Sequence, residues 1–142
     1  MFSRGNIAEK TRILRLETLK PERLGASVEE TSAVDLYAGI GYFAFSFAKA
    51  GVGTVLCWEI NPWSVEGFKR GAGRNKWTVT SVRGKVTGDW NLEGSKFIAF
   101  EESNAHASEV CLCMTDNLLR ALRLTLYRLF SGFRTSDHWY RL

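Results

Sequence analysis

Short apolar runs alternate with longer amphipathic or polar stretches along the chain, and this alternation predicts the order of its elements. The runs SAVDLY and GTVLCWE, which begin at Ser32 and Gly53, are apolar and β-branched and have the length of buried strands. The run KFIAFEES supplies a third strand, expected from Lys96 to about Glu101. From residue 77 to residue 95 the pattern is weak and punctuated by glycine, so we expect a loop with a short strand at most.

Helix-like stretches separate the predicted strands. The stretch YFAFSFAKAG is apolar and ends at Gly51, and Asn61 followed by Pro62 is a typical start for a helix that runs to about Asn75. Strand, helix, strand and helix in this order are typical of an α/β fold with a parallel sheet and right-handed crossovers.

Helices are also expected near both ends of the chain. Asn6 and Glu9 are spaced like a helix cap before an apolar stripe, and Pro21 is expected to end that helix ahead of the polar connector KPERLGASVEETS. After Asn104 we expect two helices, the second over residues 115–133, where leucines recur at helical spacing and arginines lie off that stripe. This pattern favours a packing helix over an RNA-binding one.

Length and composition indicate one globular domain. The chain has 142 residues, of which 45% are hydrophobic and 13% aromatic, and this is enough apolar surface for a packed core. The formal net charge of +4 permits a polyanionic partner but does not require one.

The cysteine count and the hydropathy of the chain bear on its cellular location, on metal binding and on membrane contact. The odd count of three cysteines indicates reduced thiols and a cytoplasmic location. Cys111 and Cys113 have no second ligand pair at zinc-site spacing, so no metal site is expected. The apolar run from Ala33 to Ala48 is too short to span a bilayer and contains Asp35, so no membrane contact is expected.

The turn between the first predicted strand and its helix carries the candidate chemistry. Gly39 and Gly41 allow a positive φ and a close approach to a ligand, and the helix start that follows offers unpaired N–H groups. Glu59 follows the second predicted strand, where an acidic residue would bind a ribose diol. The segment from Gly39 to Ala44 also fits the G-x-G-x-x-A dinucleotide pattern, which is a weak match by itself.

Asp35 decides between the two ligand classes that use this layout. A carboxylate at the strand end, just ahead of the first glycine, is poorly placed beside a pyrophosphate. It suits a ligand that carries an ammonium and a sulfonium group, which favours S-adenosylmethionine over a nicotinamide dinucleotide. A tight turn that holds no ligand stays open as an alternative.

Three blocks of the chain resemble one family. The blocks SRGN-x-x-EK-x-R, VDLYAGIGYF and WEINPWSVEG together resemble the tRNA wybutosine-synthesizing protein 2 family, in particular its fungal members, over roughly Met1 to Gly73. The segment IAFEESNAHASE resembles the family's third-strand segment more loosely. The resemblance implies a partial class I methyltransferase-like, Rossmann-like domain. It also implies transfer of an aminocarboxypropyl group from S-adenosylmethionine to the tricyclic 4-demethylwyosine base beside the anticodon of tRNA-Phe.

The resemblance implies roles for individual residues. Ser3 and Lys10 match the family's cofactor-contacting serine and lysine, and a lysine suits the methionyl carboxylate. From the residues alone, a cap hydroxyl and a solvated lysine are the favoured interpretations. Glu59 matches the ribose-binding acid. Ser103 and Asn104 stand where relatives carry Asp-Asn, so Asn104 is expected to reach the adenine, whereas Ser103 lacks the charge. The expected cofactor site therefore comprises Ser3, Lys10, Asp35, Gly39, Gly41, Glu59, Ser103 and Asn104.

The chain also departs from the family pattern. The family's tRNA-binding region does not precede the SRGN block, and its NLGLLP-type substrate loop does not follow the third-strand segment. We therefore expect an incomplete copy, with a partial S-adenosylmethionine-binding domain over residues 1–110 and an atypical helical tail over residues 111–142. We expect the sheet of this incomplete copy to have three or four strands, and we expect the chain to have little activity on tRNA.

Three functions stay open at this point: a fragment of the aminocarboxypropyltransferase, a relative of the tRNA guanine-N1 methyltransferases, and a non-catalytic module. The first reaction needs no nucleophilic side chain, because the carbons bound to a sulfonium are already activated. We therefore assign no catalytic residue and expect orientation of the base to supply most of the catalysis. We expect a cytoplasmic monomer with tRNA as its partner.

Overall fold

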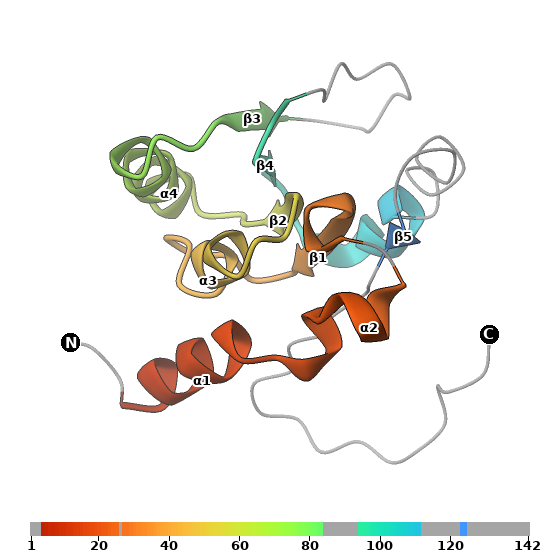
Figure 1. The fold of residues 1–142 in the computed structure, drawn as a ribbon. Helices are drawn as coiled ribbons and strands as arrows, with labels where there is room; N and C mark the ends of the chain where they lie inside the picture. The colour runs from red at the N-terminus through yellow and green to blue at the C-terminus, as the bar shows by residue number, and fades with distance from the viewer. Residues whose placement is uncertain (1–3, 26, 84–93, 112–122, 125–142) are drawn as a thin grey trace, which may run out of the picture.

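A parallel sheet forms the centre of the structure, which is a computed structural model that describes residues 4–25, 27–83, 94–111 and 123–124. The order of its strands is β3-β4-β2-β1-β5 (Figure 1). The α/β, Rossmann-like fold expected from the sequence is confirmed, and β5 is a strand that the sequence did not indicate. In chain order the strands are β1 (Thr31–Asp35), β2 (Thr54–Trp58), β3 (Val79–Val82), β4 (Phe97–Phe100) and β5 (Arg123–Leu124).

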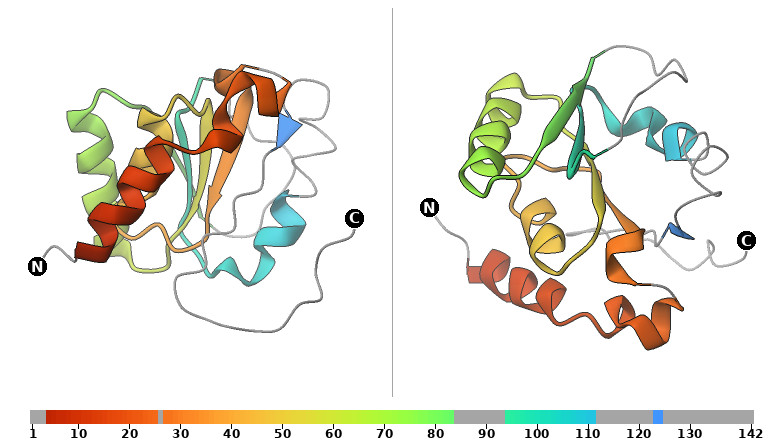
Figure 2. Two further views of the ribbon diagram at one scale, coloured as in Figure 1. Left: turned by 60° about the horizontal axis from the view of Figure 1, so that its bottom comes forward. Right: turned by 45° about the horizontal axis from the view of Figure 1, so that its top comes forward.

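Helices cover both faces of this sheet, as Figure 2 shows from two sides. α1 (Arg4–Leu14), α3 (Ala44–Lys49) and α4 (Pro62–Arg74) pack on one face, and the helical residues 107–111 pack on the other. The remaining helical segments are α2 (Pro21–Leu24) and the 3₁₀ turns Glu17–Leu19, Val28–Glu30 and Asn104–His106.

Alternate residues of the strands build two separate cores. Side chains on both faces of β1, β2 and β4 are buried, which explains why these strands are apolar along almost their whole length. The core below α1, α3 and α4 contains Ile13, Ala33, Phe47, Val55, Cys57, Phe68 and Phe97. The opposite core contains Val34, Leu56, Trp58, Ile98, Phe100, Ala107 and Val110.

Two predictions near the amino end are wrong. α1 begins at Arg4, so Asn6 lies inside the helix and does not cap it. The carboxylate of Glu9 is engaged instead by the side chain of Arg12, one turn further on, at 2.6 Å. The helix ends at Leu14, and Pro21 begins α2, because proline is tolerated in the first turn of a helix.

The predicted start of α4 is confirmed. Oδ1 of Asn61 accepts a hydrogen bond from the Trp63 N–H at 3.0 Å, and Pro62 occupies the first position of the helix. α3 is shorter than predicted and begins at Ala44, because the glycine turn continues up to it. Gly51 follows the end of α3 with a φ of 98°, as expected for a helix end.

The helix predicted over residues 115–133 is wrong at Arg123–Leu124, where the chain forms β5. These residues pair in parallel with Thr31 and Ser32 of β1. Without β5, β1 would be an edge strand with unpaired N–H and C=O groups, and leucine spacing alone does not reveal that a later segment pairs with it. The rest of the predicted helix lies outside the described residues, and the division of the chain at residue 110 stays a prediction.

Candidate functional site

The carboxyl ends of β1, β2 and β4 lie at one edge of the sheet and bring several predicted residues together. Asp35 is the last residue of β1 and lies in register with Cys57 of β2, and Trp58 of β2 lies in register with Phe100 of β4. Glu59 follows β2 directly and acts electrostatically on Asp35. Open parallel sheets bind their ligands at this edge, so the geometry supports a ligand site here.

The turn after β1 has the backbone conformation that its glycines predict. Gly39 has a φ of 54° and Gly41 a φ of 96°, both in the region that favours glycine. A Cβ on Gly41 would lie 2.6 Å from Cζ of Phe45, so no side chain fits there. A Cβ on Gly39 would meet nothing within 4 Å, so there is open space beside this residue.

Glu59 holds this turn in place. Its Oε2 accepts a hydrogen bond from the Gly39 N–H at 2.9 Å, and its Oε1 accepts one from the Asn61 N–H at 2.7 Å. Each carboxylate oxygen has more than one acceptor position, so both can still accept a hydroxyl group of a ligand. Glu59 therefore connects the turn after β1 to the start of α4 and retains the capacity to bind a ribose.

Asp35 is a buried carboxylate with an unused oxygen. Its side chain is 3% exposed, and its Oδ1 accepts a hydrogen bond from the Tyr37 N–H at 3.2 Å. Its Oδ2 has no hydrogen-bond partner in the described part of the chain. Burial raises the pKa of Asp35 from its ordinary 3.8 to about 6; the N–H groups of Tyr37 and Ala44 oppose this rise and the charge of Glu59 adds to it.

Asn104 reaches the same edge from the segment after β4. Its Nδ2 donates to the Leu36 carbonyl oxygen at 2.8 Å, which fixes the amide beside the turn and leaves Oδ1 as an acceptor. The Oγ of Ser103 accepts a hydrogen bond from the Ala105 N–H at 3.3 Å, so this hydroxyl caps the following 3₁₀ turn. Asn104 therefore lies beside the turn after β1. A cofactor contact of Ser103 stays a prediction.

Lys10 lies on the other side of the turn. Its Nζ is 4.4 Å from the centre of the Tyr42 ring, and it lines a cavity that Gly41 also lines. Among the described residues, neither Asp35 nor Glu59 lines this cavity. Contact of Lys10 with a cofactor carboxylate stays a prediction, and Ser3 lies outside the described residues.

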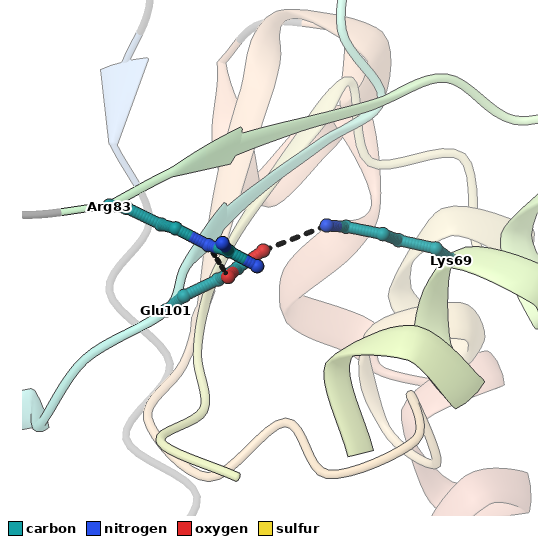
Figure 3. A network of polar contacts seen from close by, with 3 residues as sticks. All are labelled: Lys69, Arg83 and Glu101. Atoms are coloured by element: carbon teal, nitrogen blue, oxygen red, sulfur yellow. Dashed lines mark hydrogen bonds and ion pairs between the residues drawn. The ribbon is translucent and has the colours of Figure 1, made fainter. Parts of the chain in front are cut away.

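Sequence reasoning missed a charged network at the same edge. Glu101 follows β4, its side chain is 8% exposed, and it accepts hydrogen bonds from Lys69 of α4 at 2.7 Å and from Arg83 beyond β3 (Figure 3). Burial alone would raise the pKa of Glu101, but these two partners together keep it below its ordinary value. Both partners lie far away in sequence, so no local pattern could have indicated the network. It ties α4 and the end of β3 to the segment that carries Asn104.

The described ranges contain no cluster of metal ligands, no membrane-spanning helix and no disulfide. Within the described ranges, no group of three or more His, Cys, Asp or Glu side chains is placed to hold a metal ion. The helices in these ranges include none that is long and apolar enough to cross a bilayer. Cys57 and Cys111 are buried and form no disulfide, and Cys113 lies outside the described residues.

We expect Asp35→Asn to stabilise the protein at neutral pH. Because the folded-state pKa of Asp35 is raised, its contribution to stability is complete below about pH 4 and is lost as the pH rises through 6. The difference between 3.8 and about 6 corresponds to about 3 kcal/mol at neutral pH. The unfolding free energy of the variant, measured in urea, should therefore exceed that of the wild type by a margin that grows with pH.

The matched control is Glu66→Gln, which removes an exposed carboxylate from α4. Its unfolding free energy should follow that of the wild type across the same pH range. A difference between Asp35→Asn and the wild type that stays constant between about pH 4 and about pH 7 would contradict the raised pKa.

The sequence is similar to curated proteins that share one name. It is 46% identical over 109 residues to the tRNA wybutosine-synthesizing protein 2 of Schizosaccharomyces pombe, a match that covers 77% of this chain and 24% of that protein. It is 52% identical over 75 residues to the protein of the same name from Saccharomyces cerevisiae, covering 53% of this chain and 14% of that protein. The chain thus spans about a quarter or less of the length of these curated relatives.

The solved structure reported next is less similar in sequence to this chain than the curated relatives are. A solved structure of P. horikoshii TYW2 in complex with MeSAdo is 20% identical, with a TM-score of 0.48, over 73% of this chain and 30% of that chain. No family model matches the sequence. The chain is similar to the tRNA wybutosine-synthesizing protein 2 family over 77% of its own length, and it spans only part of the length of these relatives.

Proposed function

We propose that the chain is the cofactor-binding part of a tRNA wybutosine-synthesizing transferase. The proposed reaction transfers the 3-amino-3-carboxypropyl group of S-adenosylmethionine to the tricyclic 4-demethylwyosine base beside the anticodon of tRNA-Phe. The names of the curated relatives support wybutosine synthesis in tRNA, and the acidic edge of the parallel sheet supports the cofactor. tRNA is the proposed partner, and the sequence-based expectation of a cytoplasmic monomer is kept.

The observation that carries the proposal is the buried carboxylate of Asp35. Its Oδ2 has no partner in the described part of the chain, and the space beside Gly39 is open. A buried carboxylate with one oxygen that accepts no hydrogen bond is costly, and a cationic ligand group would offset that cost. S-adenosylmethionine carries an ammonium and a sulfonium group, whereas NAD would bring a pyrophosphate that a carboxylate repels.

Glu59 and Asn104 fit the nucleoside part of the same ligand. Glu59 is proposed to accept hydrogen bonds from the ribose hydroxyls, and Oδ1 of Asn104 is proposed to accept one from the adenine amino group. Both side chains are already fixed by hydrogen bonds to the turn segment after β1, through Gly39 and Leu36. A site ordered before binding loses less conformational entropy when the ligand arrives, which favours affinity.

The residues of this chain act by orientation. When bound, S-adenosylmethionine supplies carbon atoms that its sulfonium activates, so no nucleophilic side chain is required. The choice between methyl and aminocarboxypropyl transfer depends on which of these carbons faces the base. Asp35 and Glu59 would fix the two ends of the cofactor, and Lys10 and Ser3 are proposed to hold its methionyl carboxylate. No residue is assigned as an acid or a base.

We expect the chain to bind S-adenosylhomocysteine more tightly than NAD in calorimetric titration. Glu59→Ala should weaken this binding by about 1.5–3 kcal/mol, the range for hydrogen bonds to a charged group. That loss corresponds to a rise in Kd of about 10- to 150-fold. Glu66→Ala is the matched control, because it removes an exposed glutamate from α4 and should leave the Kd unchanged. Tighter binding of NAD, or an unchanged Kd for Glu59→Ala, would move the cofactor site elsewhere.

The transferred group is expected to be aminocarboxypropyl. With tRNA-Phe that carries the tricyclic base, S-adenosylmethionine labelled in its methionyl carbon chain should label the tRNA, whereas the same compound labelled in its methyl group should not. The chain spans 24% of the S. pombe relative, so its rate should fall well below that of the full-length relative assayed in parallel. Methyl label in the tRNA would favour the guanine-N1 methyltransferase alternative.

A further inference from the structure

A cavity of about 460 Å³ lies on the helix side of the glycine turn, between α1, α3 and α4. These three helices cover the same face of the sheet (Figure 2). The part of the chain that the structure describes places neither Asp35 nor Glu59 in the lining of this cavity. The cavity therefore extends away from the Asp35 and Glu59 side of the proposed cofactor site, and it adjoins that site at Lys10 and Gly41, which line the cavity and are also expected to contact the cofactor.

Basic side chains from all three helices line this cavity. Lys10 comes from α1, Lys49 from the last turn of α3, and Arg70 and Arg74 from α4. The described lining contains no acidic residue. Four positive charges without an opposing carboxylate in the lining attract an anion into the hollow.

These basic groups are weakly engaged by other parts of the protein. Arg70 makes one ion pair, with Glu66 at 3.4 Å, and both side chains are more than half exposed, so this pair contributes little. Within the described residues, no ion pair is recorded for Lys49 or Arg74. The Nζ of Lys10 lies 4.4 Å from the ring centre of Tyr42, which holds the ammonium group over the cavity.

Close packing of α4 against Phe45 of α3 and Ile40 of the glycine turn creates this arrangement. A Cβ on Gly71 would lie 2.7 Å from Cε2 of Phe45, and a Cβ on Gly67 would lie 3.1 Å from Cγ2 of Ile40. Larger residues at these positions would push α4 away from the turn. Because the two glycines are one helical turn apart, the whole face of α4 approaches the turn and brings Arg70 and Arg74 toward the other cations.

We propose that this cavity binds consecutive phosphate groups of an RNA strand. A single phosphate group carries at most about two negative charges, whereas Lys49, Arg70 and Arg74, to which no cofactor contact is assigned, can together neutralise more than one phosphate. The choice of RNA among polyanions rests on the proposed function; the anion site itself rests on the cavity and its charges.

The test compares two double variants of the full chain. Arg70→Gln with Arg74→Gln removes two cations from the cavity, and Lys20→Gln with Arg23→Gln removes the same charge from exposed positions before and on α2. Binding of a fluorescently labelled RNA stem–loop of anticodon-arm size is measured by anisotropy at a series of salt concentrations. The cavity variant should bind at least about tenfold more weakly at low salt, as expected when charge-assisted contacts are lost. The slope of the logarithm of the binding constant against the logarithm of the salt concentration should become less steep by about 1.4, which is about 0.7 for each of two lost phosphate contacts. The control variant should have the same affinity and slope as the wild type.

Thermal unfolding of the cavity variant should match that of the wild type, because both arginines are exposed. Absence of RNA binding by the wild type, or equal affinity and salt slope in both double variants, would overturn the proposal.

Titration with S-adenosylhomocysteine separates the anion site from the cofactor proposal, since the cavity variant should keep the wild-type Kd for that ligand. If the variant instead loses S-adenosylhomocysteine and keeps RNA, the cavity belongs to the cofactor. If the cavity variant loses RNA binding as predicted, but neither the wild type nor any variant binds S-adenosylhomocysteine, the result supports the anion site and contradicts the proposed cofactor.

Discussion

Two backbone hydrogen bonds to one carboxylate connect the halves of the candidate site. Glu59 accepts from Gly39 in the turn after β1 and from Asn61 at the start of α4. Asn61 in turn caps α4, so the carboxylate fixes both the turn and the first residues of the helix. A turn that contains two glycines with positive φ has many conformations when unrestrained, and this anchor selects one of them. The proposed ribose contact and the preformed shape of the turn therefore depend on the same side chain.

The two sides of this turn differ in charge. The strand edge presents the buried carboxylate of Asp35 together with Glu59, and the helix side presents a cavity lined by lysine and arginine. The net charge of +4 hides this separation, because it averages over the whole chain. A cationic cofactor and a polyanionic substrate would approach opposite sides of one rigid loop. Their relative position would then be set by the backbone of the turn, which suits a reaction that depends on orientation.

Much of the fold follows from local sequence, whereas the contacts across the fold do not. Strands β1, β2 and β4, the glycine turn and the Asn61 cap were predictable, because each depends on residues that are adjacent in the chain. The pairing of Glu101 with Lys69 and Arg83 was not, since it requires the order of the strands. The cavity cations also come together only when three helices pack side by side. The predicted Asn6 cap is wrong for a different reason, because α1 already begins at Arg4 and Asn6 lies inside the helix.

Amide chemical-shift mapping with S-adenosylhomocysteine tests most directly whether the edge formed by the ends of β1 and β2 is a preformed cofactor site. If it is, the amide signals of Gly39 and Asn61 should be sharp before ligand is added and should shift on titration. The amides of β3, at the far edge of the sheet, should stay in place. Broadened or missing signals for Gly39 and Asn61 in the unliganded protein, or shifts that avoid both residues, would contradict the account.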